Sequence, residues 1–212
     1  RNRRTGSNRF MTLTILGLYL GLVLAVGLFG QRLLRGTGED YFLASRSIGP
    51  FILLMTLFGT HMTAFSLLGA SGEAYHRGIR VFSLMASSSA LVVPVVFLFI
   101  GTRLWSVGKN QGLVTQVQFF RERWRSNGLA LALFFLLVAL LIPYLLIGVM
   151  GGGITFEQIT DGVVPRWLGS LIICTVVSAY VTAGGVRSTA WANTLQTLVF
   201  MVLGAVTFVI IV

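Results

Sequence analysis

The apolar segment from about Ile48 to Gly72 is interrupted near its middle by Gly59-Thr60-His61-Met62-Thr63. A run of about 20 apolar residues is long enough to cross a bilayer as a helix, but polar groups at that depth need protein, water or a ligand beside them. Glycine also weakens a helix by about 1 kcal/mol relative to alanine. A helix loosened here frees backbone carbonyls that can bind a cation. The alternative is an intact spanning helix whose polar residues pack against neighbouring helices.

The composition indicates an integral membrane protein. Of the 212 residues, 55% are hydrophobic and only 10% are charged, whereas soluble domains carry about 25% charged residues. The net charge of +10 does not indicate nucleic-acid binding. The arginines lie in short loops and at the N-terminus, where basic residues orient membrane proteins.

No group of residues predicts an enzyme or a metal cofactor. The single cysteine, Cys174, cannot form an intrachain disulfide, and His61 and His76 do not resemble a metal-binding pair. The sequence has no nucleophile with a plausible base and orienting acid, no HExxH and no phosphate-binding glycine loop. We therefore expect no catalytic residue, no organic cofactor and no nucleic-acid partner.

Hydropathy predicts about six membrane-spanning helices. They cover about 10–33, 48–71, 81–104, 129–151, 167–183 and 189 to the end of the chain. Close helix packing is indicated in the first span by its glycines, two of which form a GxxxG pair. These are Gly17 and Gly21 of the pair, then Gly27 and Gly30.

Three further segments have a predicted structure. Gly184-Gly185 predicts a tight turn between the fifth and sixth spans, and Gly151-Gly152-Gly153 predicts helix contact and an exit turn after the fourth. Residues 113–125 mix apolar and basic side chains. This mixture predicts a short helix in the membrane interface with Thr115 as its N-cap. The alternative for residues 113–125 is a solvated loop.

Basic residues predict the orientation. Nine of the 16 Lys and Arg residues fall in the first, third and fifth loops, and seven fall on the other side of the membrane. Basic loops stay inside, which places the N-terminus outside, although the basic N-terminal tail argues the opposite. The chain starts at Arg1 and stops within an apolar run at Val212, so we expect a fragment of a longer protein.

The second span holds the first candidate site residues. If the helix is unwound there, the backbone carbonyls of Gly59 and Met62 are two candidate cation ligands. Phe65 is a candidate cap for a substrate cavity. His61 is either a proton carrier or hydrogen-bond donor, or a packing residue.

Two later spans hold the remaining candidates. Tyr144 follows Pro143 in the fourth span and would present a hydroxyl at depth, either to a polar substrate or to a neighbouring helix. In the sixth span Asn193, Gln196 and Thr197 share one face, which must contact protein or water rather than lipid. Helix packing and lining of a polar pathway explain this face equally well.

Three stretches carry a resemblance to a known family. The first, Asp40 to Ser47, reads DYFLASRS and is close to a DYFLAGRS pattern; the second runs from Phe58 to Phe65. The third, Gly184 to Gln196, is similar to a GG-hxxhxWTDxhQ segment, and Phe120 to Trp124 fits an FLERRF-type pattern. Together they resemble the sodium:solute symporter family, which includes sodium-coupled sugar, proline and pantothenate carriers.

The resemblance implies an all-α, leucine-transporter-like fold of two inverted repeats of five helices behind an extra N-terminal helix. The chain would be a single transmembrane domain fragment. Residues 10–33 would form the extra helix and 48–212 the first repeat, and the missing second repeat is the expected partner. The resemblance also implies a sodium ion at the Gly59 and Met62 carbonyls. It implies substrate contacts at Thr63, Phe65 and Tyr144.

Two positions depart from the family pattern, because His61 and Asn193 stand where some members carry aspartate. The carbonyl site needs neither acid. We therefore expect a sodium-coupled symporter of a small polar organic solute in the plasma (inner) membrane, working by alternating access. The alternatives are a proton-coupled symporter that uses His61 and a membrane sensor that keeps the carrier fold.

Overall fold

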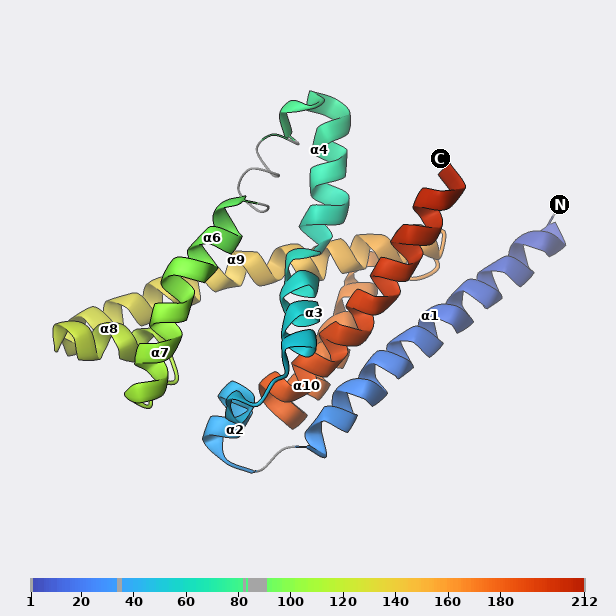
Figure 1. The fold of residues 1–212 in the computed structure, drawn as a ribbon. Helices are drawn as coiled ribbons and strands as arrows, with labels where there is room; N and C mark the ends of the chain where they lie inside the picture. The colour runs from blue at the N-terminus through green and yellow to red at the C-terminus, as the bar shows by residue number, and fades with distance from the viewer. Residues whose placement is uncertain (1, 34–35, 82, 84–90, 212) are drawn as a thin grey trace. The chain divides into compact units, whose positions relative to one another are not determined.

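The structure, a computed structural model, describes residues 2–33, 36–81, 83 and 91–211 of the chain. Every regular element in these residues is a helix, and no strand occurs among them (Figure 1). The prediction of an all-α chain is therefore confirmed for this part of the sequence. Contacts group the chain into two compact units, Arg1–Thr63 with Gly148–Val212, and Ala64–Ile147.

The first unit is built around two long helices, α1 (Asn2–Gln31) and α10 (Arg166–Ile211), which pack along each other (Figure 1). The centre of their contact is apolar. Val23 of α1 is 1% exposed and packs with Tyr180 and Ala192 of α10. Three shorter elements also contact α10: α2 (Gly38–Leu43), η1 (Ala44–Arg46) and α3 (Pro50–His61).

Helix α10 turns back on itself at Gly185. This residue has a φ of 57° and a ψ of −143°, which are non-helical angles, and glycine adopts a positive φ without the steric cost of a Cβ. Val176 and Leu195 pack against the same apolar cluster around Val23, although a straight helix would hold them about 28 Å apart. The two arms therefore lie side by side, and the predicted turn at Gly184-Gly185 is confirmed.

Close packing of α1 occurs at two of the four predicted glycines. A Cβ on either Gly27 or Gly30 would lie 2.7 Å from an atom of α10. A Cβ on Gly17 or Gly21 would meet no atom of the described residues within 4 Å, so the predicted GxxxG contact is wrong within this unit. The contact between α1 and α10 is thus tightest toward the C-terminal end of α1, next to the turn of α10.

Helix α9 (Asn127–Ile159) continues eight residues past Gly151, so the predicted exit turn after the fourth span is wrong. The predicted helix contact is present, because Cβ atoms on Gly152-Gly153 would collide with atoms of α10. The glycines let α9 continue in close contact with α10. The chain turns only at Asp161-Gly162, where both residues have a positive φ.

The second unit contains the start of α9, up to Ile147, and a series of short helices. They are the π-helical turn η2 (Phe65–Gly69), α4 (Ala70–Arg77), α6 (Val93–Val96), the π-helical turn η4 (Phe97–Gly101), α7 (Thr102–Asn110) and α8 (Gln116–Trp124). The third predicted span, 81–104, lies partly outside the described residues. Its described end continues as helix to Asn110.

Helix α8 confirms the short helix predicted between the third and fourth spans. The Thr115 hydroxyl accepts a hydrogen bond from the Gln118 N–H at 3.2 Å, and the Gln118 side chain accepts one from the Thr115 N–H at 3.1 Å. This reciprocal arrangement is a capping box. Arg125 ends the helix with a φ of 48°. The placement of α8 in the membrane interface stays a prediction.

By length and composition, three described helices can cross a membrane: Phe10–Gln31, α9 and the 45-residue stretch Arg166–Ile210 of α10. A fourth span results if Gly38–Arg46 and Pro50–His61, which meet at 105°, count as one. A straight helix of the length of α10 would measure about 68 Å, against about 30 Å for the apolar layer of a bilayer. Each arm of α10 is therefore long enough for a span of its own. The total of about six spans stays a prediction.

We expect Gly30→Ala to destabilise the protein and Gly17→Ala not to do so. A methyl group on Gly30 meets the Ser188 Cα at 2.7 Å, and overpacking of this kind costs about 1–3 kcal/mol. Position 17 is open, and alanine there gains helix propensity. The measurement is the melting temperature, in detergent, of the protein translated from the complete gene. Equal melting temperatures for the two variants would contradict the contact between α1 and α10.

Candidate functional site

Helix α3 ends inside the interrupted apolar segment. Its last backbone hydrogen bond runs from the Met62 N–H to the Phe58 carbonyl at 3.1 Å, and Met62 leaves the helical region with a φ of −84° and a ψ of 64°. Thr63 is non-helical, and η2 begins at Phe65. The last four carbonyls of a helix have no intrahelical partner. The Gly59 and Met62 carbonyls therefore both lie beyond the hydrogen-bond ladder of α3.

The helix is interrupted as predicted, but the break comes three residues later than Gly59. Gly59 keeps helical geometry, and the chain leaves the helix at Met62. The Thr60 hydroxyl donates to the Thr56 carbonyl at 2.8 Å, so this polar group is satisfied within its own helix. Glycine at position 59 is needed for a different reason, which is close packing on α10.

Gly59 lies in close contact with the second arm of α10, the part that follows Gly185. A Cβ on Gly59 would collide with the Thr197 Oγ1 and would lie 3.5 Å from the Asn193 carbonyl oxygen. Thr197 is 1% exposed, and its hydroxyl donates to the Met55 carbonyl at 3.0 Å. A buried hydrogen bond therefore joins the two helices about one turn before Gly59.

Two further contacts show the relative direction of these helices. The Thr56 hydroxyl donates to the Ala190 carbonyl at 3.4 Å, and the Phe58 and Phe200 ring centroids are 6.4 Å apart. Of these two contacts, the one that is later in α3 is also the later one in α10. Helix α3 and the second arm of α10 therefore run in the same general direction (Figure 1).

The three residues of the predicted polar face on α10 differ in how deeply they are buried. Thr197 is buried against α3, as the need to contact protein predicts, whereas Asn193 and Gln196 are half-buried. The backbone of Asn193 faces Gly59. The assignment of Asn193 and Gln196 to a polar pathway stays a prediction.

Four other predicted residues lie at the break, just after it or on α9. His61 is the last residue of α3 and is exposed, and Thr63 directly after the break is half-buried. The backbone of Phe65 begins η2, but its side chain lies outside the described part of the structure. Tyr144 is 53% exposed on α9. The break thus gathers the two predicted ion ligands with Thr63. Phe65 and Tyr144 belong to the second unit, and their contacts stay predictions.

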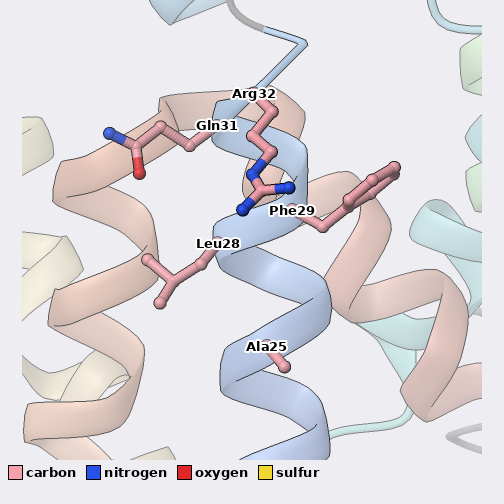
Figure 2. A pocket seen from close by; sticks show the side chains of 5 residues that line it. All are labelled: Ala25, Leu28, Phe29, Gln31 and Arg32. Atoms are coloured by element: carbon pink, nitrogen blue, oxygen red, sulfur yellow. The ribbon is translucent and has the colours of Figure 1, made fainter.

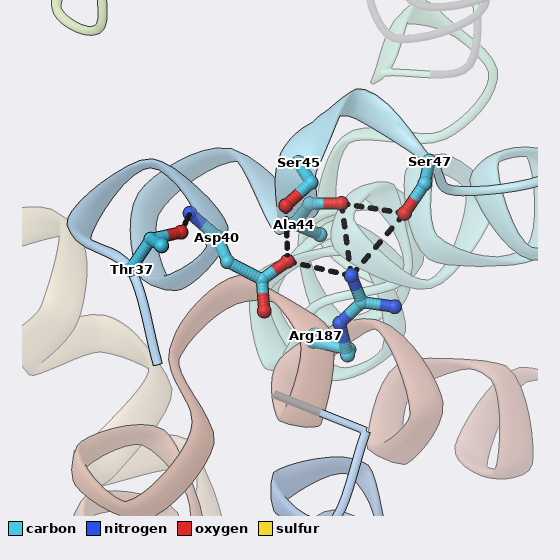
Figure 3. Close-up of polar contacts among 6 residues, drawn as sticks. All are labelled: Thr37, Asp40, Ala44, Ser45, Ser47 and Arg187. Carbon is cyan, nitrogen blue, oxygen red and sulfur yellow. Dashed lines mark hydrogen bonds and ion pairs between the residues drawn. The ribbon is translucent and has the colours of Figure 1, made fainter. Parts of the chain in front are cut away.

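A buried ion pair, which the sequence analysis does not predict, joins α2 to α10. Asp40 is fully buried, and its Oδ1 lies 2.6 Å from the Arg187 Nη2 (Figure 3). The Ser45 hydroxyl donates to the same carboxylate oxygen at 2.7 Å. The Arg187 Nη2 also donates to the Ala44 carbonyl at 3.1 Å and to the Ser47 hydroxyl at 3.2 Å.

The signal for this pair in the sequence is weak, because its partners are 147 residues apart. Each partner does stand in a stretch that carries the family resemblance, Asp40 in residues 40–47 and Arg187 in residues 184–196. An acid in one motif and a base in another predict a contact only when the fold is known to bring the two motifs together.

A surface pocket of about 400 Å³ lies at the C-terminal end of α1 (Figure 2). It is lined by Ala25, Leu28, Phe29, Gln31 and Arg32. No residue of the predicted site is among them. The Phe29 ring also packs edge-on against Trp191, with centroids 6.2 Å apart. The candidate ion site is therefore the break after α3 and not this pocket.

Comparison with known proteins decides the family. The profile of the sodium:solute symporter family matches residues 41–212, which is most of the chain. The chain belongs to the sodium:solute symporter family. The resemblance predicted from the motifs is therefore confirmed. Membership, together with the long apolar helices, makes this an integral membrane protein whose relatives are transporters.

Three relatives show how much of the family the chain covers. The sodium/pantothenate symporter of Escherichia coli (strain K12) is 31% identical over 91% of this chain and 39% of that protein. The uncharacterized symporter YhjB of Bacillus subtilis (strain 168) is 25% identical over 87% and 38%, respectively. The sodium/glucose cotransporter of Vibrio parahaemolyticus is 23% identical over 92% and 35%. The chain thus spans less than two fifths of the length of these relatives. No solved structure matches it significantly.

We expect Gly59→Ala to cost about 1–3 kcal/mol of stability, because the added methyl enters the space of the Thr197 Oγ1. The double variant Gly59→Ala/Thr197→Ala should recover part of this loss, since the hydroxyl is removed. Gly148→Ala is the matched control, because a Cβ there meets no described atom within 4 Å. Melting temperatures of the single and double variants measure the coupling. Strictly additive losses at 59 and 197 would argue against the contact.

Proposed function

We propose that this chain contributes the ion-binding part of a symporter that uses a sodium gradient to take up a small polar organic solute. The observation that carries the proposal is the end of α3 at His61, in a chain of this family. That ending leaves the Gly59 and Met62 carbonyls without a helical partner. The proposal assigns these two carbonyls as sodium ligands, with further ligands from a second repeat outside this chain.

The C-terminal end of α3 suits a cation for two physical reasons. Its unpaired carbonyls offer oxygen ligands, and the helix dipole places about half a negative charge at this end. Irregular backbone at membrane depth is tolerated only where protein or a water-filled cavity surrounds it. Packing of α3 on α10 supplies such an environment on one side of the break.

The solute is proposed to bind beside the ion. Its proposed contacts are Thr63, Phe65 and Tyr144, and the proposed polar pathway consists of His61, Asn193 and Gln196. Thr63 directly follows the ion ligand Met62 in the chain, so the solute and the ion can both stabilise the same geometry of the break. The names of two relatives specify pantothenate and glucose. Both are small polar organic molecules, and we place the solute of this protein in that class.

The proposed architecture is a single transmembrane domain with a leucine-transporter-like fold. Residues 10–33 form an extra first helix, and 48–212 form the first of two inverted repeats, with 113–125 in the membrane interface. The N-terminus is outside and the membrane is the plasma membrane. The chain covers only 35–39% of the length of these two relatives, which leaves room for a second repeat outside it.

Sodium couples to transport by differential affinity. A ligand shifts a conformational equilibrium only as far as it binds one conformation more tightly than the other. Sodium bound at the Gly59 and Met62 carbonyls favours the conformation in which α3 is broken and packed on α10. The buried bond from Thr197 to Met55 belongs to that conformation.

Uptake into proteoliposomes tests the proposal. The protein translated from the complete gene is reconstituted, and radiolabelled pantothenate and glucose serve as the first probes. An inward sodium gradient is compared with potassium or choline at equal ionic strength and with a proton gradient alone. The proposal predicts uptake with the sodium gradient only. It also predicts a sodium-specific rise in melting temperature, which does not depend on the choice of solute.

Other outcomes would replace the proposal. Uptake that follows a proton gradient without sodium, and that His61→Ala abolishes, would establish proton coupling. A sodium-specific rise in melting temperature without transport of any solute would favour a sensor. A protein that responds to sodium no differently from potassium or choline would contradict a sodium site.

We expect Thr63→Val to raise the KM for the solute about tenfold, because one hydrogen bond worth about 1.4 kcal/mol is lost. Thr60→Val is the matched control, since the Thr60 hydroxyl already bonds to the Thr56 carbonyl within α3. The measurement is sodium-driven uptake as a function of solute concentration. A similar change of KM in both variants would remove Thr63 from the solute site.

A further inference from the structure

Residues 37–47 pack against α10 at the point where α10 turns back. The Tyr41 hydroxyl donates to the Val181 carbonyl, before the turn, at 3.2 Å. A Cβ on Gly185, at the turn itself, would collide with the Tyr41 carbonyl. Asp40 pairs with Arg187 after the turn (Figure 3). Helix α2 therefore contacts both arms of α10.

The local backbone is shaped to hold this ion pair. The Thr37 hydroxyl caps α2 by accepting from the Asp40 N–H at 3.2 Å. Ala44, Ser45 and Arg46 have φ values of 50°, 51° and 53°, a left-handed conformation that is uncommon for residues other than glycine. Such a conformation persists where surrounding contacts enforce it. Here the Ala44 carbonyl and the Ser45 hydroxyl both bond within the ion pair.

Because the Asp40–Arg187 pair is buried, it fixes the geometry of this segment more than it adds to the stability of the protein. The Asp40 side chain is 0% exposed and that of Arg187 is 15% exposed, and the Arg187 Nε is buried with no partner among the described residues. A buried ion pair contributes little net stability, because desolvation offsets the attraction between the charges. Replacing one partner by a neutral residue leaves the charge of the other partner buried and uncompensated.

The pair lies at one end of α3 and the ion ligands at the other. Three residues, Ser47 to Gly49, connect the ion-pair segment to α3, which is 12 residues long or about 18 Å. The segment before α3 bonds to Arg187 of the second arm through Ser47, and the middle of α3 bonds to Thr197 of the same arm through Met55. Nearer the end of α3, Gly59 packs against the same Thr197 side chain. A shift at Arg187 therefore moves α3 along α10 and displaces the Gly59 and Met62 carbonyls.

We propose that Asp40 and Arg187 are positioning residues for the ion site. Their pairing sets the register of α3 on α10 and thereby the geometry of the two carbonyl ligands, without contact with the ion. This inference rests on the proposed sodium site at the break after α3.

The test separates stability from sodium affinity. Wild type, Asp40→Asn, Arg187→Gln and the double variant are prepared as the protein translated from the complete gene. For each, the melting temperature is measured without sodium. The sodium concentration that produces half of the sodium-induced rise is then measured, with choline replacing sodium at constant ionic strength.

The single variants should melt at lower temperatures, because each leaves one buried charge unpaired. The double variant should regain most of this loss, since neither charge remains. Its half-saturating sodium concentration should nevertheless stay at least about fivefold above that of wild type, the low end of typical coupling between sites. If sodium affinity returns together with the melting temperature, the pair is only structural and the inference is wrong. If the single variants do not fold, the double variant still decides.

A conservative variant and a matched control complete the design. All printed bonds of the Arg187 guanidinium leave from one nitrogen, Nη2, and a lysine ammonium also has three donors. Arg187→Lys should therefore keep a sodium affinity near that of wild type. Glu157→Gln breaks the more exposed ion pair with Arg166 and should leave sodium affinity unchanged. A loss of affinity in Glu157→Gln as large as in the double variant would overturn the inference.

The two proposals fail in different ways. If the wild-type protein shows no sodium-specific change in melting temperature, the proposed function fails and the inference falls with it. If wild type responds and the Asp40/Arg187 double variant has the same half-saturating sodium concentration, only the positioning role fails.

Discussion

The packing of α3 against the second arm of α10 is the contact on which the candidate site depends. A helix that stops within an apolar segment leaves carbonyls unpaired, which is costly unless protein or a ligand surrounds them. Gly59 lets the helices approach, and the buried bond from Thr197 to Met55 holds them together about two turns before the break. Tertiary packing therefore stabilises the break at Met62, whereas the low helix propensity of glycine alone would favour a break at Gly59.

Features with a local cause could be predicted from the sequence. The α8 helix follows from a capping box between Thr115 and Gln118, whose signal lies within four residues. The turn of α10 follows from the conformational freedom of Gly185, and the interruption of α3 follows from polar residues in an apolar run. The motif resemblance was also sufficient to predict the family that the comparison confirms.

Features that depend on contacts between residues far apart in the chain could not be predicted from the sequence in the same way. Gly17 and Gly27 look alike in the sequence, but only Gly27 faces α10, because the facing residues depend on how the two helices cross. Helix α9 passes through its glycines because α10 packs against them. The Asp40–Arg187 pair joins two of the stretches that carry the family resemblance. Two stretches that resemble the family pattern are thus in physical contact through α2 and α10.

Hydrogen exchange across residues 55–70, followed by mass spectrometry, tests the central claim most directly. The protein translated from the complete gene is compared in sodium and in potassium at equal ionic strength. A cation held by the Gly59 and Met62 carbonyls restrains the break, so the account predicts slower exchange in sodium, centred on the amides that follow Met62 and absent from α8. Identical exchange of this segment in the two salts would contradict an ion site at the end of α3.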